Sequence, residues 1–88
     1  MAGESINDIA KEKHIRIWVV NFIDGTCATI ATFYQVGILS ETDGYLVENG
    51  IVTNKYLDFN DPDFSYEKHF GKKPIGKPQD VTDDYRKA

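Results

Sequence analysis

The stretch IRIWVVNFIDGTCATIATFY, residues 15–34, decides the fold because an Asp-Gly pair separates two runs of strand-forming residues. Isoleucine, valine, threonine and the aromatic residues suit the pleated surface of a β-sheet. The pair Asp24-Gly25 is typical of a two-residue hairpin turn, in which glycine adopts a positive φ angle without strain. We therefore expect residues 15–23 and 26–36 to pair as antiparallel strands.

Two further pairs repeat this turn signal, Asp-Gly at 43–44 and Asn-Gly at 49–50. The runs at 45–48 and 51–59 are again rich in residues that favour strands. The sequence therefore predicts an α+β fold that is mostly β, a four-stranded antiparallel meander. Such a sheet could also curl into a small barrel.

The first helix that the sequence predicts is short and N-terminal. Ser5 followed by Asp8 approximates a capping box, in which a side-chain oxygen accepts a hydrogen bond from an unpaired N–H of the first turn. Ile6, Ile9 and Ala10 would then form a narrow apolar stripe that faces the sheet.

A second short helix is expected near residues 62–70. Asp-Pro-Asp at 61–63 is typical of a helix start, and Gly71 is typical of a helix end. The segment that follows contains two prolines and a glycine and has no apolar pattern. We therefore expect a single globular domain at 1–71 and an extended or flexible C-terminal arm at 72–88.

Both faces of the first hairpin are apolar. A two-residue turn would put Trp18 opposite Ala31 and place Trp18, Phe22 and Phe33 on one face, with isoleucines on the other. A sheet with two apolar faces has to be covered on both sides. Two short helices are too small for this, so we expect barrel closure, a second copy of the chain or a foreign partner to cover the rest.

Composition limits the setting of the protein. The 88 residues contain a single cysteine, Cys27, so no internal disulfide can form, and a lone thiol fits a reducing compartment. The sequence shows no apolar run near the roughly 20 residues that span a bilayer. We therefore expect a cytoplasmic (intracellular) protein with no membrane partner.

Charge is divided unevenly along the chain. Residues 1–67 carry eleven acidic and four basic side chains, whereas residues 68–79 carry four lysines and no acid. An acidic body repels phosphate backbones, so this pattern disfavours nucleic acid as a partner. It favours a basic protein partner for the body, and the lysine-rich segment could contact an acidic surface, either of this chain or of a neighbouring molecule.

The sequence does not predict an enzyme. Cys27 lies within an expected strand, and His14, a candidate base, lies at the far end of the same hairpin. The acidic run at 58–63 lacks the spacing and central glycine of a calcium loop. We therefore expect no catalytic, metal or cofactor site.

The hypothesis that remains is a non-catalytic protein–protein interaction module, a homo-oligomer or part of an obligate complex. It would bind through an apolar sheet face and the C-terminal arm. The candidate partner-binding residues are aromatic side chains of the sheet and lysine or apolar side chains of the arm: Trp18, Phe22, Phe33, Tyr34, Lys72, Lys73, Ile75 and Lys77.

Four alternatives stay open. The same aromatic residues could form the core of a monomer. The acidic body could mimic nucleic acid and inhibit a nucleic-acid-binding protein, or a small barrel could itself bind nucleic acid through stacked aromatic rings. A closed barrel could also hold a small-ligand or enzymatic pocket.

Overall fold

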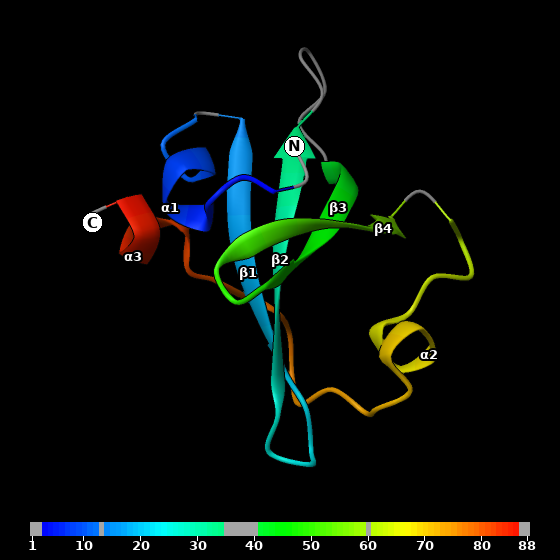
Figure 1. Ribbon diagram of the computed structural model, residues 1–88. Coiled ribbons are helices and arrows are strands. Elements are labelled where there is room, and N and C mark those ends of the chain that lie inside the picture. Colours follow the sequence, from blue (N-terminus) through cyan, green and yellow to red (C-terminus); the bar gives the residue numbers. More distant parts are fainter. Residues whose placement is uncertain (1–2, 13, 35–40, 60, 87–88) are drawn as a thin grey trace.

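The computed structural model describes residues 3–12, 14–34, 41–59 and 61–86, with the backbone alone for residues 33, 34 and 41–43. Its centre is a five-stranded antiparallel sheet in the order β4-β3-β2-β1-β5 (Figure 1). The strands are β1 (Ile15–Asn21), β2 (Cys27–Tyr34), β3 (Glu41–Glu48), β4 (Ile51–Asp58) and β5 (Gln79–Asp80). The helices are α1 (Ile6–Ile9), α2 (Tyr66–Phe70) and α3 (Thr82–Arg86). The mostly β meander is confirmed, and the sheet is open rather than closed into a barrel.

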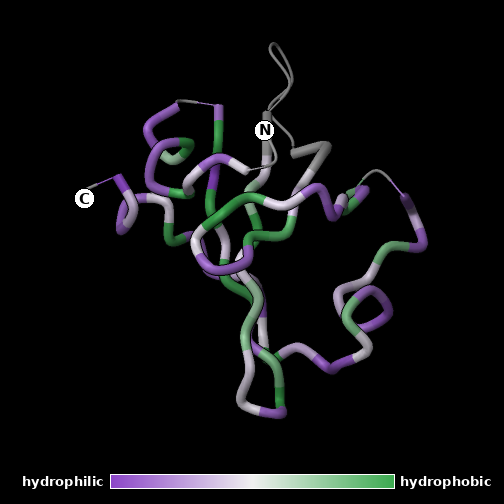
Figure 2. Tube along the Cα trace, viewed as in Figure 1, coloured by the Kyte–Doolittle hydropathy of each residue, from purple (hydrophilic) through white to green (hydrophobic). Residues whose placement is uncertain are grey.

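Each face of the sheet carries a buried apolar cluster, and the chain itself supplies the covers. On one face α1 and α3 enclose a core cluster that includes Ile15, Ile17 and Ala31. On the other face Phe22 and Ile30 belong to a cluster covered by α2 and the segment that leads to it. Figure 1 shows α1 and α3 on one side of the strands and α2 on the other, and Figure 2 shows hydrophobic residues gathered on the central strands.

The first hairpin forms with a register one residue away from the predicted one. The N–H of Phe22 donates to the carbonyl of Thr26 at 2.9 Å, so the loop has three residues, 23–25, and Asn21 lies opposite Cys27. Gly25 closes this loop with φ 87°. An Asp-Gly pair fits both loop lengths, because a three-residue loop also ends with a residue of positive φ.

The register decides which side chains share a face. Trp18 lies opposite Ile30 rather than Ala31, and Phe33 lies opposite Ile15 in the backbone ladder. Because side chains alternate along a strand, Trp18 and Phe22 share their face with Ile30. Phe33 takes a register position on the opposite face, so the predicted grouping of Phe33 with Trp18 and Phe22 is wrong.

The predicted turn at 43–44 is also wrong. Gly44 lies inside β3, opposite Thr32 on one side and Leu57 on the other. A Cβ on Gly44 would come within 2.6 Å of Cε2 of Phe59. Glycine stands here because a ring packs against the backbone, which is one of the uses of glycine within strands. The link between β2 and β3 falls in residues outside the described part of the chain. The Asn-Gly turn at 49–50 is confirmed, with φ 55° and 75°.

The N-terminal helix is confirmed. The hydroxyl of Ser5 accepts a hydrogen bond from the N–H of Asn7 at 3.3 Å, and Ile6 and Ile9 are buried. The N–H of Ile6 donates to the carbonyl of Gly50 at 2.8 Å, which ties α1 to the turn between β3 and β4. The apolar stripe predicted from the sequence is thus the face that docks on the sheet.

The second helix starts later than the sequence predicts. The side chain of Asp61 accepts from the N–H of Asp63 at 2.9 Å in a separate turn, and α2 begins only at Tyr66. Ser65 is the N-cap, since its hydroxyl accepts from the N–H of Lys68 at 3.1 Å. The expected end at Gly71 is confirmed by a left-handed φ of 71°.

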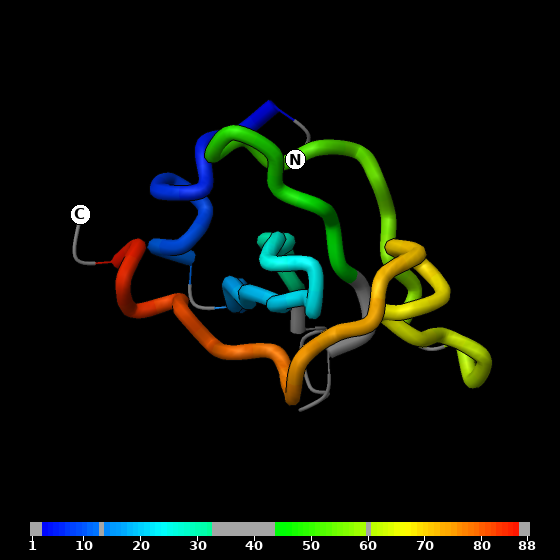
Figure 3. Tube along the Cα trace, turned by 90° about the horizontal axis from the view of Figure 1, so that it is seen from below, coloured from blue at the N-terminus to red at the C-terminus, as the bar shows by residue number. Residues whose placement is uncertain are grey.

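The C-terminal segment, expected as an extended or flexible arm, lies with its backbone along the outer edge of β1. The N–H of Ile75 donates to the carbonyl of Asn21 at 2.8 Å, and the N–H of Val81 donates to the carbonyl of Ile17 at 2.9 Å. Between these bonds, β5 pairs with β1 at Val19. Figure 3 shows this segment, orange to red, passing along the central hairpin.

Side chains at the end of the segment complete the docking. Thr82 is fully buried, and its hydroxyl accepts a hydrogen bond from the N–H of Ile17 at 2.8 Å. The guanidinium of Arg86 donates to the carbonyl of Ala10 at 2.6 Å, which joins α3 to the end of α1. The main-chain hydrogen bonds to β1 do not depend on the type of side chain, which explains why the side-chain pattern did not reveal this docking.

The close approach at Gly44 gives a direct test of the packing. We expect Gly44→Ala to lower the free energy of unfolding by about 1–3 kcal/mol, because the new methyl group overpacks against Phe59. Urea unfolding measures this cost. In a Phe59→Leu background the flat ring edge is absent, so the cost of the same substitution should be smaller. An equal cost in both backgrounds would contradict the assigned contact.

Candidate functional site

The structure brings the predicted site residues together in two separate places. Trp18 and Lys77 line one hollow, and Phe22 and Lys72 line another. Lys73 and Ile75 lie on the exposed side of the C-terminal segment. The side chains of Phe33 and Tyr34, predicted to bind a partner, lie outside the described part of the chain.

The first of these, here called the Trp18 hollow, has a volume of about 290 Å³ and is lined by Trp18, Tyr66, Lys77 and Pro78. It lies where β1, α2 and the C-terminal segment meet. The Trp18 side chain is half-buried, and its indole N–H donates to the hydroxyl of Thr32 at 2.8 Å. This bond fixes the orientation of the ring and occupies its N–H donor. The hollow therefore presents an apolar aromatic surface.

The wall opposite Trp18 is held by aromatic packing. Tyr66 stacks on Phe70 with an angle of 10° between the ring planes and a centroid distance of 6.5 Å. Phe64 makes an edge-on contact with Tyr66 at 5.3 Å, and Phe59 lies 6.2 Å from it, centroid to centroid. Since each ring fixes the next, the hollow is formed before any partner binds.

An ion pair anchors the strand next to Trp18. Asp80 lies opposite Trp18 in the β1–β5 ladder, and its carboxylate is 3.5 Å from the guanidinium of Arg16. Partial burial of Asp80 raises its pKa. Hydrogen bonds from the hydroxyl and N–H of Thr82 and the positive charges of Arg16 and Arg86 lower the pKa by more than burial raises it. The pKa of Asp80 is therefore held below its ordinary value.

The lowered pKa of Asp80 predicts a pH dependence of stability. A carboxylate with a depressed pKa in the folded state stabilises above its unfolded pKa, and this contribution is lost as the pH falls through the folded value. The wild type should therefore lose stability from about pH 5 downwards. The variant Asp80→Asn should be less stable than the wild type at pH 7 and should lose less stability than the wild type below about pH 5. Urea unfolding at each pH measures both differences.

A neighbouring acid provides the control for this pH experiment. Asp83→Asn removes an exposed carboxylate from the first turn of α3 and leaves Asp80 and Thr82 in place. We expect this variant to follow the pH profile of the wild type. If Asp80→Asn loses as much stability in acid as the wild type does, Asp80 is not the group that fastens the segment.

The second hollow, here called the β2-edge groove, has a volume of about 260 Å³. Its lining residues come from the β1–β2 hairpin, β3 and the end of α2: Phe22, Cys27, Ala28, Thr29, Leu46, Val47, Glu48, Phe70 and Lys72. Phe22 is only 2% exposed and makes an edge-on contact with Phe70 at 5.3 Å. It forms part of the core, as the monomer alternative expected, and lies beneath the groove.

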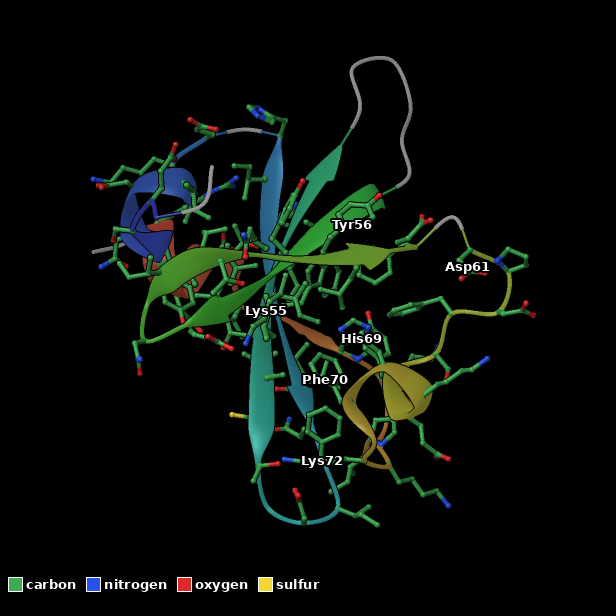
Figure 4. All side chains as sticks on the ribbon, turned by 45° about the vertical axis from the view of Figure 1, so that its right-hand side comes forward. Lys55, Tyr56, Asp61, His69, Phe70 and Lys72 are labelled. Carbon is green, nitrogen blue, oxygen red and sulfur yellow. The ribbon has the colours of Figure 1, made fainter. Side chains whose placement is uncertain are left out.

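Lys72 closes the end of the β2-edge groove near the hairpin loop. Its ammonium lies 5.7 Å from the ring centroid of Phe22 and 3.3 Å from the carboxylate of Asp24. Hydrogen bonds from the hydroxyl and N–H of Thr26, followed by the effect of Lys72, lower the pKa of Asp24. Figure 4 shows Lys72 and Phe70 between α2 and the hairpin.

The described side chains do not gather into a cluster suited to metal binding. No three His, Cys, Asp or Glu side chains among them gather closely enough to hold a metal ion. Cys27 is exposed beside the hairpin loop, and His14 lies at the other end of β1. A third hollow of about 180 Å³ surrounds the N-cap of α2, on the side of Asp61 and His69. What the two larger hollows offer is apolar surface with a lysine at the edge.

Sequence reasoning missed the residues that complete the two hollows. Tyr66 and Phe70 are four residues apart and so share one face of α2, which signals a docking surface but not its partner. Nothing in the sequence marks Pro78 or Leu46, because they reach their hollows through the fold.

Comparisons with protein-family models, with curated proteins and with solved structures find no match to this chain. No helix in the described part of the chain has both the length and the apolar character needed to cross a membrane. The function therefore has to be argued from the geometry of the two hollows.

Proposed function

We propose that this protein is a non-catalytic protein–protein interaction module that holds its partner through the Trp18 hollow. The observation that carries this proposal is the meeting of a sheet aromatic, Trp18, with an exposed lysine of the C-terminal segment, Lys77, around one open apolar hollow. Tryptophan and tyrosine in such positions are the residues that most often dominate binding energy at protein interfaces.

The size of the hollow favours a side chain as its occupant. At about 290 Å³ it lies at the lower limit of the cavities that bind small molecules. Because the indole N–H of Trp18 is already bonded to Thr32, the ring offers apolar contact rather than a hydrogen-bond donor. A large apolar or aromatic side chain from a partner is the group that best matches this surface.

Charge favours an acidic surface around that anchoring side chain. Lys77 is exposed at the rim, and it belongs to the segment 68–79, which carries four lysines and no acid. A carboxylate on the partner next to its anchor would complete the pairing and set its orientation. The acidic remainder of this chain would at the same time repel acidic proteins that lack the anchor.

A charge reversal at Lys77 tests the proposed function. We expect affinity capture from cells that express the protein to recover a partner, and Lys77→Glu to weaken its binding at least about tenfold, because attraction becomes repulsion. Isothermal titration with the recovered partner measures the change, and light scattering shows whether that partner is a second copy of the chain.

Lys68→Glu is the matched control for Lys77→Glu. Lys68 is also exposed and lies within the same run of lysines, but it faces the hollow at the start of α2 rather than the Trp18 hollow. The net charge of the two variants is identical, so equal weakening by both would mean that charge alone matters. Unchanged binding of Lys77→Glu would contradict the proposed site.

A further inference from the structure

The lower part of β2 has an edge that the sheet does not use. The ladder between β2 and β3 ends at the pair Thr29 and Val47, and β3 turns away at Asn49. β2 nevertheless stays paired with β1 as far as Cys27. Within the described part of the chain, no strand pairs with Cys27 on the side away from β1.

The hydrogen bonds on the other side show which backbone groups face this edge. The carbonyl of Asn21 accepts from the N–H of Ile75, so the backbone groups of Asn21 point away from β2. In an antiparallel ladder, a residue opposite such a position also points its N–H and C=O outwards. Cys27 lies opposite Asn21, so one donor and one acceptor of its main chain face away from β1.

Those two groups lie at the β2-edge groove. Cys27 lines this groove, and Phe70 at the end of α2 forms the facing wall. Phe22 and Leu46 supply an apolar floor between the strand edge and the helix. The groove is therefore bordered by a strand edge, an apolar floor and a helix on the opposite side. Figure 4 shows Phe70 and Lys72 in the region between α2 and the hairpin.

Charge at the end of the groove narrows the kind of chain that fits. The ammonium of Lys72 has three N–H donors, and the hydroxyl of Thr26 and the carboxylate of Asp24 take two of them. The third donor is available to a carboxylate of an incoming segment. At the opposite end Glu48 is already paired with Lys55 at 2.7 Å, so that end supplies no unbalanced charge.

We propose that the β2-edge groove binds an extended segment of a partner protein, which adds to β2 as a further strand at Cys27. The segment directs an apolar side chain at the floor of Phe22 and Phe70 and places a carboxylate near Lys72. This site is separate from the Trp18 hollow and uses main-chain pairing rather than a side-chain anchor, so it goes beyond the proposed function.

A peptide selection tests this inference without knowledge of the natural partner. The full-length protein is used to select from a displayed library of random twelve-residue peptides, and the enriched peptides are added to the ¹⁵N-labelled protein. We expect them to contain an apolar residue close to an acid, to shift the amide signal of Cys27 and to protect it from hydrogen exchange.

Methylation of the peptide backbone then separates strand addition from side-chain binding. N-methylation at the peptide position that pairs with Cys27 should lower the affinity at least about tenfold, because it removes a main-chain donor. N-methylation at the next position, whose N–H points away from β2, should have little effect.

A substitution in the protein gives the complementary test. Cys27→Pro removes the outward N–H while leaving the ladder with β1 intact, since proline is tolerated where the N–H faces outwards. We expect it to weaken the selected peptides at least about tenfold, whereas Cys27→Ala should bind as the wild type does. Thermal unfolding checks that both variants fold, and if Cys27→Pro does not, the methylated peptides decide.

Several results would overturn the inference: a library that enriches no sequence, enriched peptides that leave the amide of Cys27 unchanged, or equal binding by both methylated peptides. None of these results changes the binding effect expected for Lys77→Glu. A failure of strand addition at Cys27 is therefore distinguishable from a failure of the proposed function. Conversely, a result that contradicts binding at the Trp18 hollow would not contradict strand addition at Cys27.

Discussion

The main-chain hydrogen bonds between the C-terminal segment and the outer edge of β1 are the constraint on which the rest of the structure depends. They satisfy N–H and C=O groups that would otherwise remain unpaired on the outer edge of β1. The N–H of Ile17 on the same edge donates to the hydroxyl of Thr82. The same docking carries Val81 and Tyr85 onto the core beneath α1. It also brings Lys77 and Pro78 next to Trp18, so the candidate site exists only because this edge is closed.

The strand content, the first helix and the two-sided burial of the first hairpin could be predicted, because each follows from local residue patterns. The register of that hairpin could not, since an Asp-Gly pair serves loops of two or three residues. Gly44 was mistaken for a turn because its true role, a close approach of Phe59, involves residues fifteen positions apart that only the fold brings together. The covers of the sheet were likewise underestimated. The main-chain hydrogen bonds that dock the C-terminal segment, and with it α3, leave no side-chain pattern in the sequence.

In the candidate site, too, individual residues could be predicted from the sequence, whereas their arrangement in space could not. Trp18 and Lys77 were predicted as binding residues, but their meeting in one hollow depends on the course of the C-terminal segment. Phe22 was predicted as an anchor and is instead buried beneath the β2-edge groove, because α2 covers that face. The open edge at Cys27 has no sequence signal at all, since it arises where β3 stops short of the end of β2.

Hydrogen exchange of backbone amides measures the closing of the β1 edge most directly. The amides of Ile75 and Val81 donate to β1, so they should exchange as slowly as that of Val20 in the centre of the sheet. The amide of Gly76, for which no hydrogen bond is expected, provides the internal reference for fast exchange. If Ile75 and Val81 exchange as fast as Gly76, the segment is not docked, and neither the Trp18 hollow nor the function proposed for it can stand.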